Sequence, residues 1–293
     1  MYCSSVRRRF TIPLAHGASL AVGDRTLIMG VINVTPDSFS DGGRLLDHAR
    51  AIEAGVQMAE EGADLIDVGG ESTRPGAEPI AASEELRRVL PVIEGLAARV
   101  AVPISVDTYR ASTAAAALTA GAALINDVSG LRYDPDLAGV VAAHRAGIVL
   151  MHSRGRSREM YEQASYHDVI AEVLDELRES MAFATSAGVA TDRIIVDPGL
   201  GFAKEARHSY EVLAGLDAFT ELGRPLLVGP SRKSFLARPL GGSLGPAERD
   251  WATAAAATAA VLAGAHIVRV HAVRQMLQVV RVADEIRRYH AGT

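Results

Sequence analysis

Short apolar runs alternate with amphipathic helical stretches along most of the chain. The runs are four to seven residues long and do not alternate strictly between apolar and polar positions. A continuous apolar run of this length is typical of a strand buried on both faces of a parallel sheet. The predicted strands are residues 27–33, 64–69, 103–107, 122–126, 147–152, 193–197, 225–228 and 266–271.

A helical stretch follows every predicted strand. These stretches lie at or within residues 47–62, 83–99, 110–120, 135–143, 166–187, 210–222, 247–263 and 273–289. Eight strand–helix units predict an α/β protein with a closed (β/α)₈ barrel, the TIM barrel fold. An open, doubly wound parallel sheet is the alternative arrangement of the same units.

The first 26 residues precede the repeating units. The pairs His16-Gly17 and Gly23-Asp24 are typical of turns, so this segment predicts a short β-hairpin at the bottom of the barrel. No low-complexity linker interrupts the rest of the chain. We therefore expect an N-terminal segment at residues 1–26 and one barrel domain at residues 27–293.

Composition narrows the classes of protein that fit this pattern. The chain has 293 residues and a formal net charge of -5, so general attraction to nucleic acid or anionic membranes is not expected. The lone cysteine, Cys3, cannot form an internal disulfide, which fits a reducing compartment. The charge-free stretch Trp251–Val268 is long enough for a membrane span, but it is rich in alanine and divides near Gly264. We expect a packed helix and a strand there, and, without a signal-peptide pattern, a cytoplasmic protein.

Polar side chains recur where the predicted strands end. In a β/α barrel the carboxyl ends of the strands converge on the active site, so these residues become candidates together. Taken singly, Asp107 could cap a helix, Asn126 could satisfy a turn and His152 could be a hydrogen-bonded core histidine. The residues at or just beyond strand ends are Asn33, Asp107, Asn126, His152, Asp197, Lys233, Arg269 and His271.

The loops at the same end divide these candidates into two groups. Loops 34–43 and 71–79 are longer than a plain connection, and such loops are often lids or binding loops. The cationic side chains suit phosphate oxygens; they are Arg74, Lys233, Arg269 and His271. The acceptors Asp107, Asn126 and Asp197 suit the N–H edge of a flat heterocycle. One or two oxygen ligands together with phosphate would suit Mg²⁺.

Several motifs resemble dihydropteroate synthase, a family of pterin-binding enzymes. They are GVINVTPDSFSDGG at Gly30–Gly43, GGESTRPGA at Gly69–Ala77, Ser105–Asp107, Asn126-Asp127, DPGLGFAK at Asp197–Lys204, SRKSF at Ser231–Phe235 and RVH at Arg269–His271. The resemblance extends from about Leu27 to the end of the chain, with the motifs in the family's order. It implies a (β/α)₈ barrel, usually a homodimer, in folate biosynthesis. The implied enzyme is a transferase that condenses 6-hydroxymethyl-7,8-dihydropterin pyrophosphate with p-aminobenzoate, forming 7,8-dihydropteroate and pyrophosphate.

The resemblance also implies roles for individual residues. Those that would bind the pterin are Asp107, Asn126, Asp197 and Lys233, with Met151 against the ring. Those that would bind the pyrophosphate are Asn33, Arg74, Arg269 and His271, and Asn33 would also bind Mg²⁺. Those that would shape the p-aminobenzoate site are Phe39, Thr73, Pro75, Phe202 and Ser234. Asn33, Asp107, Asp197 and Lys233 are the expected catalytic residues, and a sulfonamide is expected to compete with p-aminobenzoate.

Three positions depart from the family's pattern. Ala272 replaces an acid that often follows the strand-eight histidine, which leaves open what orients His271. Ser157 stands where a proline is usual, and Ala252 stands where a glycine is common. Two other functions therefore stay open. One is a methyltransferase-like domain that takes methyl groups from methyltetrahydrofolate, and the other is a pterin-binding paralogue without catalysis.

Overall fold

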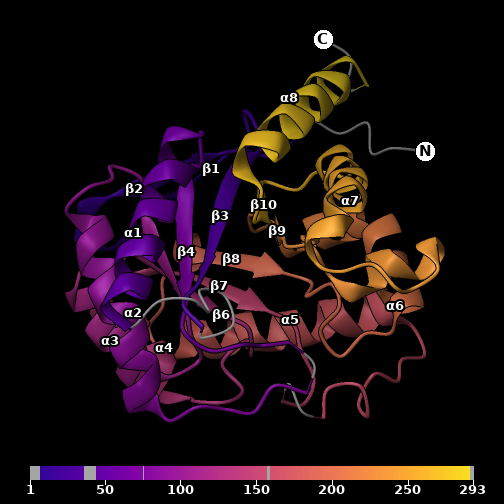
Figure 1. The fold of residues 1–293 in the computed structure, drawn as a ribbon. Coiled ribbons are helices and arrows are strands. Elements are labelled where there is room, and N and C mark those ends of the chain that lie inside the picture. The colour runs from indigo at the N-terminus through magenta and orange to yellow at the C-terminus, as the bar shows by residue number, and fades with distance from the viewer. Residues whose placement is uncertain (1–6, 36–43, 75, 157–158, 291–293) are drawn as a thin grey trace.

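The barrel predicted from the apolar runs is present. The computed structural model describes residues 7–35, 44–74, 76–156 and 159–290. In this part of the chain eight parallel strands form one sheet, in the order β8-β7-β6-β5-β4-β3-β10-β9. A bridge between Val196 and Leu226 joins the two outer strands of that order. The sheet is thereby a nearly closed TIM barrel, and the open doubly wound alternative is excluded (Figure 1).

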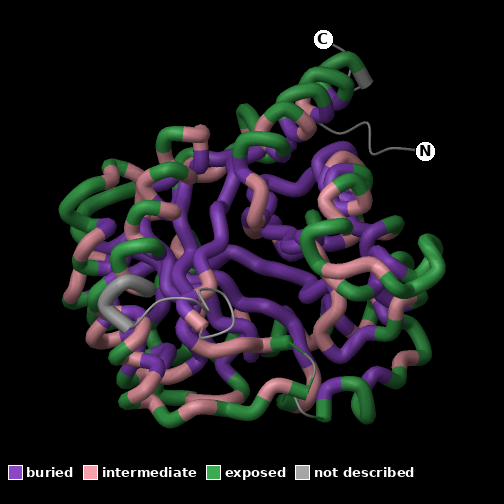
Figure 2. The backbone as a smooth tube through the Cα atoms, in the orientation of Figure 1, coloured by how far each residue is buried: buried purple, intermediate pink, exposed green. Residues whose placement is uncertain are grey.

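Each predicted strand is found within one to two residues of its expected bounds. The strands are β3 Leu27–Asn33, β4 Leu65–Gly69, β5 Ile104–Asp107, β6 Leu124–Asp127, β7 Gly147–Met151, β8 Ile194–Asp197, β9 Leu227–Val228 and β10 Ile267–Val270. Their residues are almost all buried, as the continuous apolar runs indicated, and Figure 2 shows the strands as the buried centre of the molecule.

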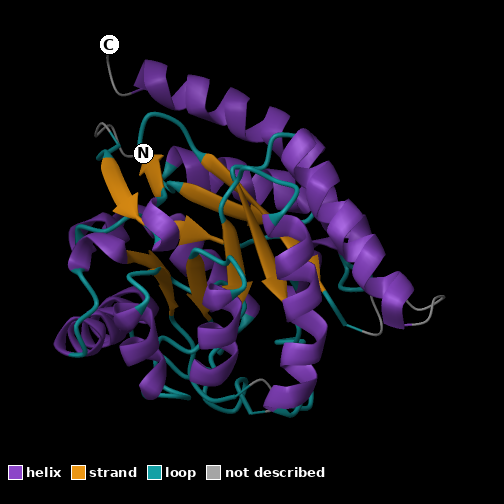
Figure 3. Ribbon diagram, turned by 90° about the vertical axis from the view of Figure 1, so that its left-hand side faces the viewer, coloured by secondary structure: helices purple, strands orange, loops and turns teal. Residues whose placement is uncertain are grey.

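The helices surround the strands on the outside of the barrel (Figure 3). They are α1 Arg44–Glu60, α2 Ala82–Ala97, α3 Ala111–Thr119, α4 Asp136–Ala143, α5 Val169–Ser186, α6 Ala206–Ala214, α7 Asp250–Leu262 and α8 Val273–His290. Within the described ranges, no helix is both long and apolar enough to cross a membrane. The charge-free stretch is divided between α7 and β10, as expected.

One predicted helix, residues 210–222, is wrong in its extent. The structure has α6 four residues earlier and then a separate 3₁₀ helix, η4, at Leu216–Leu222. Gly215 lies between them in a non-helical conformation. A Cβ atom at Gly215 would lie 2.4 Å from Cδ1 of Ile170 in α5. Close packing against α5 therefore requires a residue without a Cβ where α6 ends, and the periodicity of the sequence does not reveal it.

The strand register brings the polar strand ends into one row. Asn33 pairs with Gly69, Gly69 pairs with Asp107, and Asp107 pairs with Asn126 across β3 to β6. On the far side, Met151 of β7 pairs with Asp197 of β8. Since parallel strands in register end at the same level, these side chains share one end of the barrel.

The other end of the barrel is covered by the predicted hairpin. Strands β1 (Phe10–Pro13) and β2 (Ser19–Val22) pair antiparallel, with Ile12 opposite Leu20. Both side chains are buried in one apolar cluster with Leu124 and Ile195 from the barrel strands. The hairpin therefore completes the core where the strands begin, and it lies away from the polar strand ends.

We expect the hairpin to contribute to stability through this apolar contact. Replacing Ile12, which is 0% exposed, with alanine leaves a cavity and should lower the free energy of unfolding by about 2–4 kcal/mol in urea denaturation. Thr11→Ala, on the exposed face of the same strand, is the matched control and should change it by less than about 0.5 kcal/mol. Equal effects of the two variants would show that the hairpin does not pack as described.

Candidate functional site

An arginine and two carboxylates lie at the centre of the polar end of the barrel. Arg269 of β10 donates from Nε to Oδ2 of Asp67 at 2.6 Å and from Nη2 to Oδ2 of Asp107 at 2.8 Å. Asn126 of β6 donates from Nδ2 to the same Asp67 oxygen at 2.8 Å. Side chains from β4, β5, β6 and β10 are thus linked across the barrel by hydrogen bonds and charge.

Asp67 is a residue that the sequence reasoning missed. It is completely buried in the middle of β4, and its second oxygen, Oδ1, has no hydrogen-bond partner among the described residues. The signal was an acid inside an otherwise apolar strand, which is costly unless the carboxylate is paired. We call Asp67, Asp107, Asn126 and Asp197 the polar floor of the site.

The floor has more acceptors than the protein supplies donors. Burial raises the pKa of Asp107 to about 7; the Arg269 charge opposes this shift, and the Asp67 charge adds to it. Burial likewise raises the pKa of Asp197, although Lys233 and the Gly199 amide, which donates to Oδ1 at 2.7 Å, favour the ionised form. A ligand that brings N–H donors to these oxygens would stabilise their charged forms.

Lys233 faces the floor from the loop before the 3₁₀ helix η5 (Ser234–Leu240). Its Nζ donates to the carbonyl of Leu200 and lies 4.5 Å from the centre of the Phe202 ring. Burial lowers its pKa to about 8, while the charge of Asp197 opposes the shift. The ammonium is therefore fixed by the loop that follows β8.

An apolar wall stands beside the floor. Met151 is buried in a cluster with Tyr109 and Val128, and Phe202 and Tyr133 pack against it. A flat ring lying on this wall would bring its edges to the polar floor. The predicted position of Met151 against a ring is compatible with this geometry.

Two of the residues predicted to bind pyrophosphate, Asn33 and His271, lie next to each other. Nδ1 of His271 is 2.9 Å from Oγ of Ser231, which also accepts from the His271 main-chain N–H at 3.2 Å. Nδ2 of Asn33 lies 3.4 Å from Nε2. Burial, followed by the charges of Arg269, Arg232 and Arg74, lowers the His271 pKa to about 3, so the free imidazole is neutral.

Ser231 thus orients His271, a role that the sequence left unassigned because Ala272 replaces the usual acid. With Nε2 accepting from Asn33, Nδ1 carries the ring hydrogen and donates to Ser231 Oγ. The described residues contain no cluster of three or more His, Cys, Asp or Glu side chains that could bind a metal, and the Mg²⁺ site at Asn33 stays a prediction.

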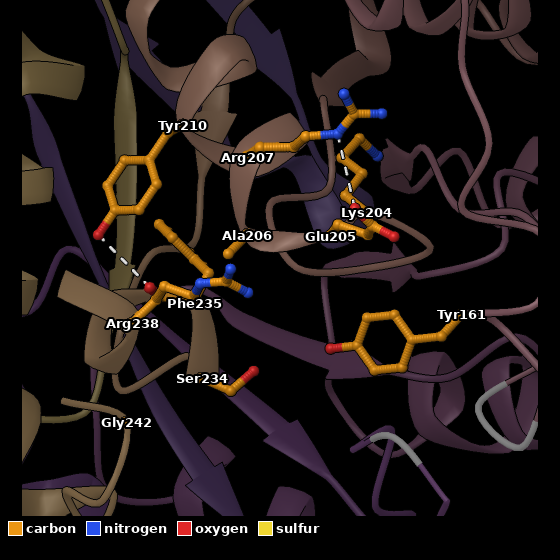
Figure 4. A pocket seen from close by; sticks show the side chains of 10 residues that line it. All are labelled: Tyr161, Lys204, Glu205, Ala206, Arg207, Tyr210, Ser234, Phe235, Arg238 and Gly242. Carbon is orange, nitrogen blue, oxygen red and sulfur yellow. Dashed lines mark hydrogen bonds and ion pairs between the residues drawn. The ribbon is translucent and has the colours of Figure 1, made fainter.

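The remaining predicted residues are spread around this centre. Arg74 is exposed and Thr73 is half-buried in the loop after β4. Ser234 lines a cavity of about 620 Å³ between η5 and the start of α6, with Tyr161, Arg207 and Arg238 also on its wall (Figure 4). None of the other predicted site residues that the structure describes lines that cavity. Phe39, Pro75 and Ser157 lie outside the described residues.

His152 is the hydrogen-bonded core histidine that the more conservative interpretation expected. Its Nδ1 is 2.8 Å from Nζ of Lys204, and Nε2 is 3.2 Å from Oε2 of Glu176. This buried lysine was not predicted. Asp127, next to Asn126, accepts from Ser129 and from the Leu131 amide, so its role is to fix its own loop.

The chain matches a known protein family over most of its length. The family model described as "Pterin binding enzyme" matches residues 29–271. The dihydropteroate synthase of Synechocystis is 45% identical over 95% of this chain and 96% of its own length.

Two solved structures are also similar. The Xanthomonas albilineans dihydropteroate synthase with 4-aminobenzoic acid has a TM-score of 0.87 and 43% identity, covering 94% of this chain and 99% of that one. The Yersinia pestis enzyme in complex with a sulfonamide drug has a TM-score of 0.88 and 37% identity, covering 96% and 100%. The similarity extends over nearly the whole of each protein.

The raised pKa of Asp107 predicts a pH-dependent effect on stability. A carboxyl with a higher pKa in the folded than in the unfolded state weakens the fold as pH rises from about 4 to about 7. Asp107→Asn removes this ionisation. Its free energy of unfolding, relative to the unmodified protein, should therefore increase by roughly 2 kcal/mol between pH 5 and pH 8.

Urea denaturation at a series of pH values measures this difference. Asp136→Asn, at the start of α4 on the outside of the barrel, is the control and should show no comparable change. A pH-independent effect of Asp107→Asn would mean that this carboxyl ionises normally in the folded protein.

Proposed function

Because the chain belongs to the pterin binding enzyme family and, within it, to the dihydropteroate synthases, we propose that it condenses 6-hydroxymethyl-7,8-dihydropterin pyrophosphate with p-aminobenzoate. The products are 7,8-dihydropteroate and pyrophosphate. The observation that carries this proposal beyond the family is the polar floor, whose buried carboxylates have raised pKa values at Asp107 and Asp197 and, at Oδ1 of Asp67, no donor among the described residues. The amino and ring N–H groups of a pterin are donors of the required kind.

Recognition of the ring follows from the residues around it. Asp107 and Asp197 accept N–H groups, Asn126 contributes an amide that is already oriented by Asp67, and Lys233 donates to an acceptor of the ring. Met151 supplies the apolar surface on which the ring lies. Each new hydrogen bond to a buried carboxylate stabilises its charged form, so ring binding and ionisation favour each other.

The reaction breaks one bond and forms another. The C–O bond between the pterin methylene and pyrophosphate breaks, and its electron pair leaves with pyrophosphate. The amine nitrogen of p-aminobenzoate gives its lone pair to the methylene carbon and loses one proton. Ionised Asp107 and Asp197 stabilise the positive charge that develops on the pterin as the C–O bond breaks.

Pyrophosphate departs toward the cationic side of the site. We assign its binding to Arg74, Arg269, His271 and Asn33. Arg269 keeps 20% of its side chain exposed while it pairs with Asp67 and Asp107, so it can act on both the floor and the leaving group. Asn33 would bind Mg²⁺ through Oδ1, and the ion would supply positive charge to the departing pyrophosphate.

We propose that Phe202, Ser234 and Thr73, together with Phe39 and Pro75, shape the p-aminobenzoate site. Phe202 and Lys233 make an apolar and a cationic contact available next to the ring site. The complex of the Yersinia pestis relative supports the further proposal that a sulfonamide occupies this side in competition with p-aminobenzoate.

We also propose a homodimer. Helices α7 and α8 expose large apolar side chains on the outer surface: Trp251 at 87%, Tyr289 at 75% and Val282 at 60%. A second copy covering these side chains would remove them from water. For the location of the protein we propose the cytoplasm, supported by a sequence with one cysteine.

Turnover with both substrates tests the proposed function. The protein with Mg²⁺, the pterin pyrophosphate and p-aminobenzoate should form one dihydropteroate for each pyrophosphate released. Asp107→Ala and Lys233→Ala should lower kcat/KM by about 100-fold or more, because each removes a charged contact in a buried site. Thr11→Ala, at the opposite end of the barrel, should retain the activity of the unmodified protein.

The other two functions give different results in the same assay. Tight pterin binding without turnover would support the non-catalytic paralogue and contradict the proposal. Methyl transfer from methyltetrahydrofolate to a corrinoid, without pyrophosphate release, would support the methyltransferase-like domain.

A further inference from the structure

Lys204 is a buried lysine to which the proposed reaction assigns no role. It is one of only two lysines in the chain, and it is 1% exposed. It lies between β8 and α6, in the loop of residues 198–205. Burial lowers its pKa well below the usual value. A buried ammonium is costly, so the contacts that offset this cost indicate what the residue does.

Its contacts form a chain that leads away from the site. Nζ is 2.8 Å from Nδ1 of His152 and donates to the carbonyl of Phe202 at 3.2 Å. Burial, followed by the Lys204 charge, lowers the His152 pKa to about 3, so the imidazole is neutral and its Nδ1 accepts from Lys204. Nε2 then carries the ring hydrogen and lies 3.2 Å from Oε2 of Glu176, an electrostatic contact without hydrogen-bond geometry.

Glu176 is itself fixed in position. Its carboxylate is paired with Arg154 and, at 3.0 Å, with Nη2 of Arg132. The favourable ion pairs and the His152 contact keep its pKa at about 2 despite burial. The Glu176 carboxylate, the His152 imidazole and the Lys204 amine thus lie in a row that ends at the loop after β8.

The loop of residues 198–205 needs fixed contacts because several of its residues have positive φ angles. Gly199, Gly201 and Ala203 all have positive φ, with Ala203 at 46°. A left-handed conformation costs a residue with a Cβ roughly 1 kcal/mol, so neighbouring contacts must maintain it. Tyr166 donates to the Ala203 carbonyl at 2.9 Å, and Lys204 donates to the carbonyl just before it.

The opposite side of the same loop forms part of the site. Gly199 donates to Asp197, the Leu200 carbonyl accepts from Lys233, and the Phe202 ring lies against the Lys233 ammonium. A shift of the Phe202 carbonyl would move the ring of that residue and loosen its contact with Lys233. Lys204 and the site residue Lys233 are thus connected through only a few residues of the loop backbone.

We propose that Lys204, oriented by His152 and Glu176, is a positioning residue that aligns Phe202 and Lys233 for p-aminobenzoate beside the bound pterin. The inference rests on the proposed function for its substrate and on the described contacts for its mechanism. Lys204 acts through the loop and does not touch the reacting atoms. The pterin site depends on it less, because only Asp197 and Lys233 of that site contact the loop, whereas Asp67, Asp107 and Asn126 are connected by hydrogen bonds elsewhere.

Lys204→Met tests the proposal, because it keeps most of the side-chain length and removes both hydrogen bonds. The KM for p-aminobenzoate should rise by about tenfold or more, as expected for the loss of a hydrogen bond to a charged group. The affinity for 6-hydroxymethylpterin in calorimetry should change by less than about threefold. A normal KM for p-aminobenzoate, with only a lower melting temperature, would reduce Lys204 to a structural residue and overturn the proposal.

Variants of His152 distinguish the effect of its hydrogen bond with Lys204 from the effect of general packing. His152→Asn retains an acceptor at the place of Nδ1 and should keep the KM within about threefold of that of the unmodified protein. His152→Leu removes the acceptor and should resemble Lys204→Met, and the double variant should be no worse than either single one, because the two side chains act as one unit. A rise in KM for the double variant equal to the product of the two single rises would contradict this coupling.

His208→Leu is the matched control. His208 is also buried, packs on Tyr166 with ring centres 5.1 Å apart, and has no hydrogen-bond partner for its ring nitrogens among the described residues. It should leave the KM for p-aminobenzoate unchanged. An increase as large as that of Lys204→Met would show that any disturbance of this cluster has the same effect.

A measurement without substrates separates this inference from the proposed function. Hydrogen–deuterium exchange of the amides at residues 199–204 should become about tenfold faster in Lys204→Met, while exchange in α5 stays unchanged. If the unmodified protein shows no turnover but this acceleration is found, the proposed function fails and the anchoring mechanism stands. Unchanged exchange in the loop would refute the anchoring whatever the turnover.

Discussion

The site depends on the pairing of Arg269 with Asp67 and Asp107. This interaction joins β10 to β4 and β5 at the centre of the barrel, and Asn126 extends it to β6. A single buried guanidinium cannot satisfy every oxygen of two carboxylates and still face a ligand. Oδ1 of Asp67 has no partner among the described residues, and the pKa of Asp107 stays raised. The barrel therefore keeps acceptors without donors at the place where a ring would bind.

This arrangement weakens the fold in order to favour binding. Buried carboxylates with raised pKa values cost stability near neutral pH, and the rest of the barrel must offset that cost. The apolar strands and the hairpin that covers their beginnings provide a core away from the site. Stability and recognition thus come from opposite ends of the same eight strands, which is typical of β/α barrels.

Much of this was predictable from the sequence. Strand lengths and burial follow from the apolar runs, and the carboxyl ends of parallel strands must converge, so Asn33, Asp107, Asn126 and Asp197 could be grouped before the structure was known. What the sequence does not show is pairing between distant positions. The role of Asp67 is identified by its contact with Arg269, and that of Ser231 by its contact with His271.

The other unpredicted features also depend on three-dimensional contacts. The approach of Ile170, which is far away in the sequence, leaves no room for a Cβ at Gly215, where α6 ends. His152 and Lys204 are 52 positions apart, and nothing in the spacing indicates that one orients the other. A carboxylate or a lysine in an apolar strand or a glycine-rich loop can be flagged as costly from the sequence alone, but its partner cannot be identified there.

The ionisation of Asp107 in the presence and absence of a pterin tests the central claim most directly. Carbon-13 NMR of aspartate carboxyl groups, with Asp107→Asn to assign the signal, measures its pKa in each state. We predict a pKa of about 7 in the free protein and a decrease of about two units or more with saturating 6-hydroxymethylpterin, because the ring supplies the missing donors. An ordinary pKa in the free protein, or a raised one that the pterin leaves unchanged, would contradict the account.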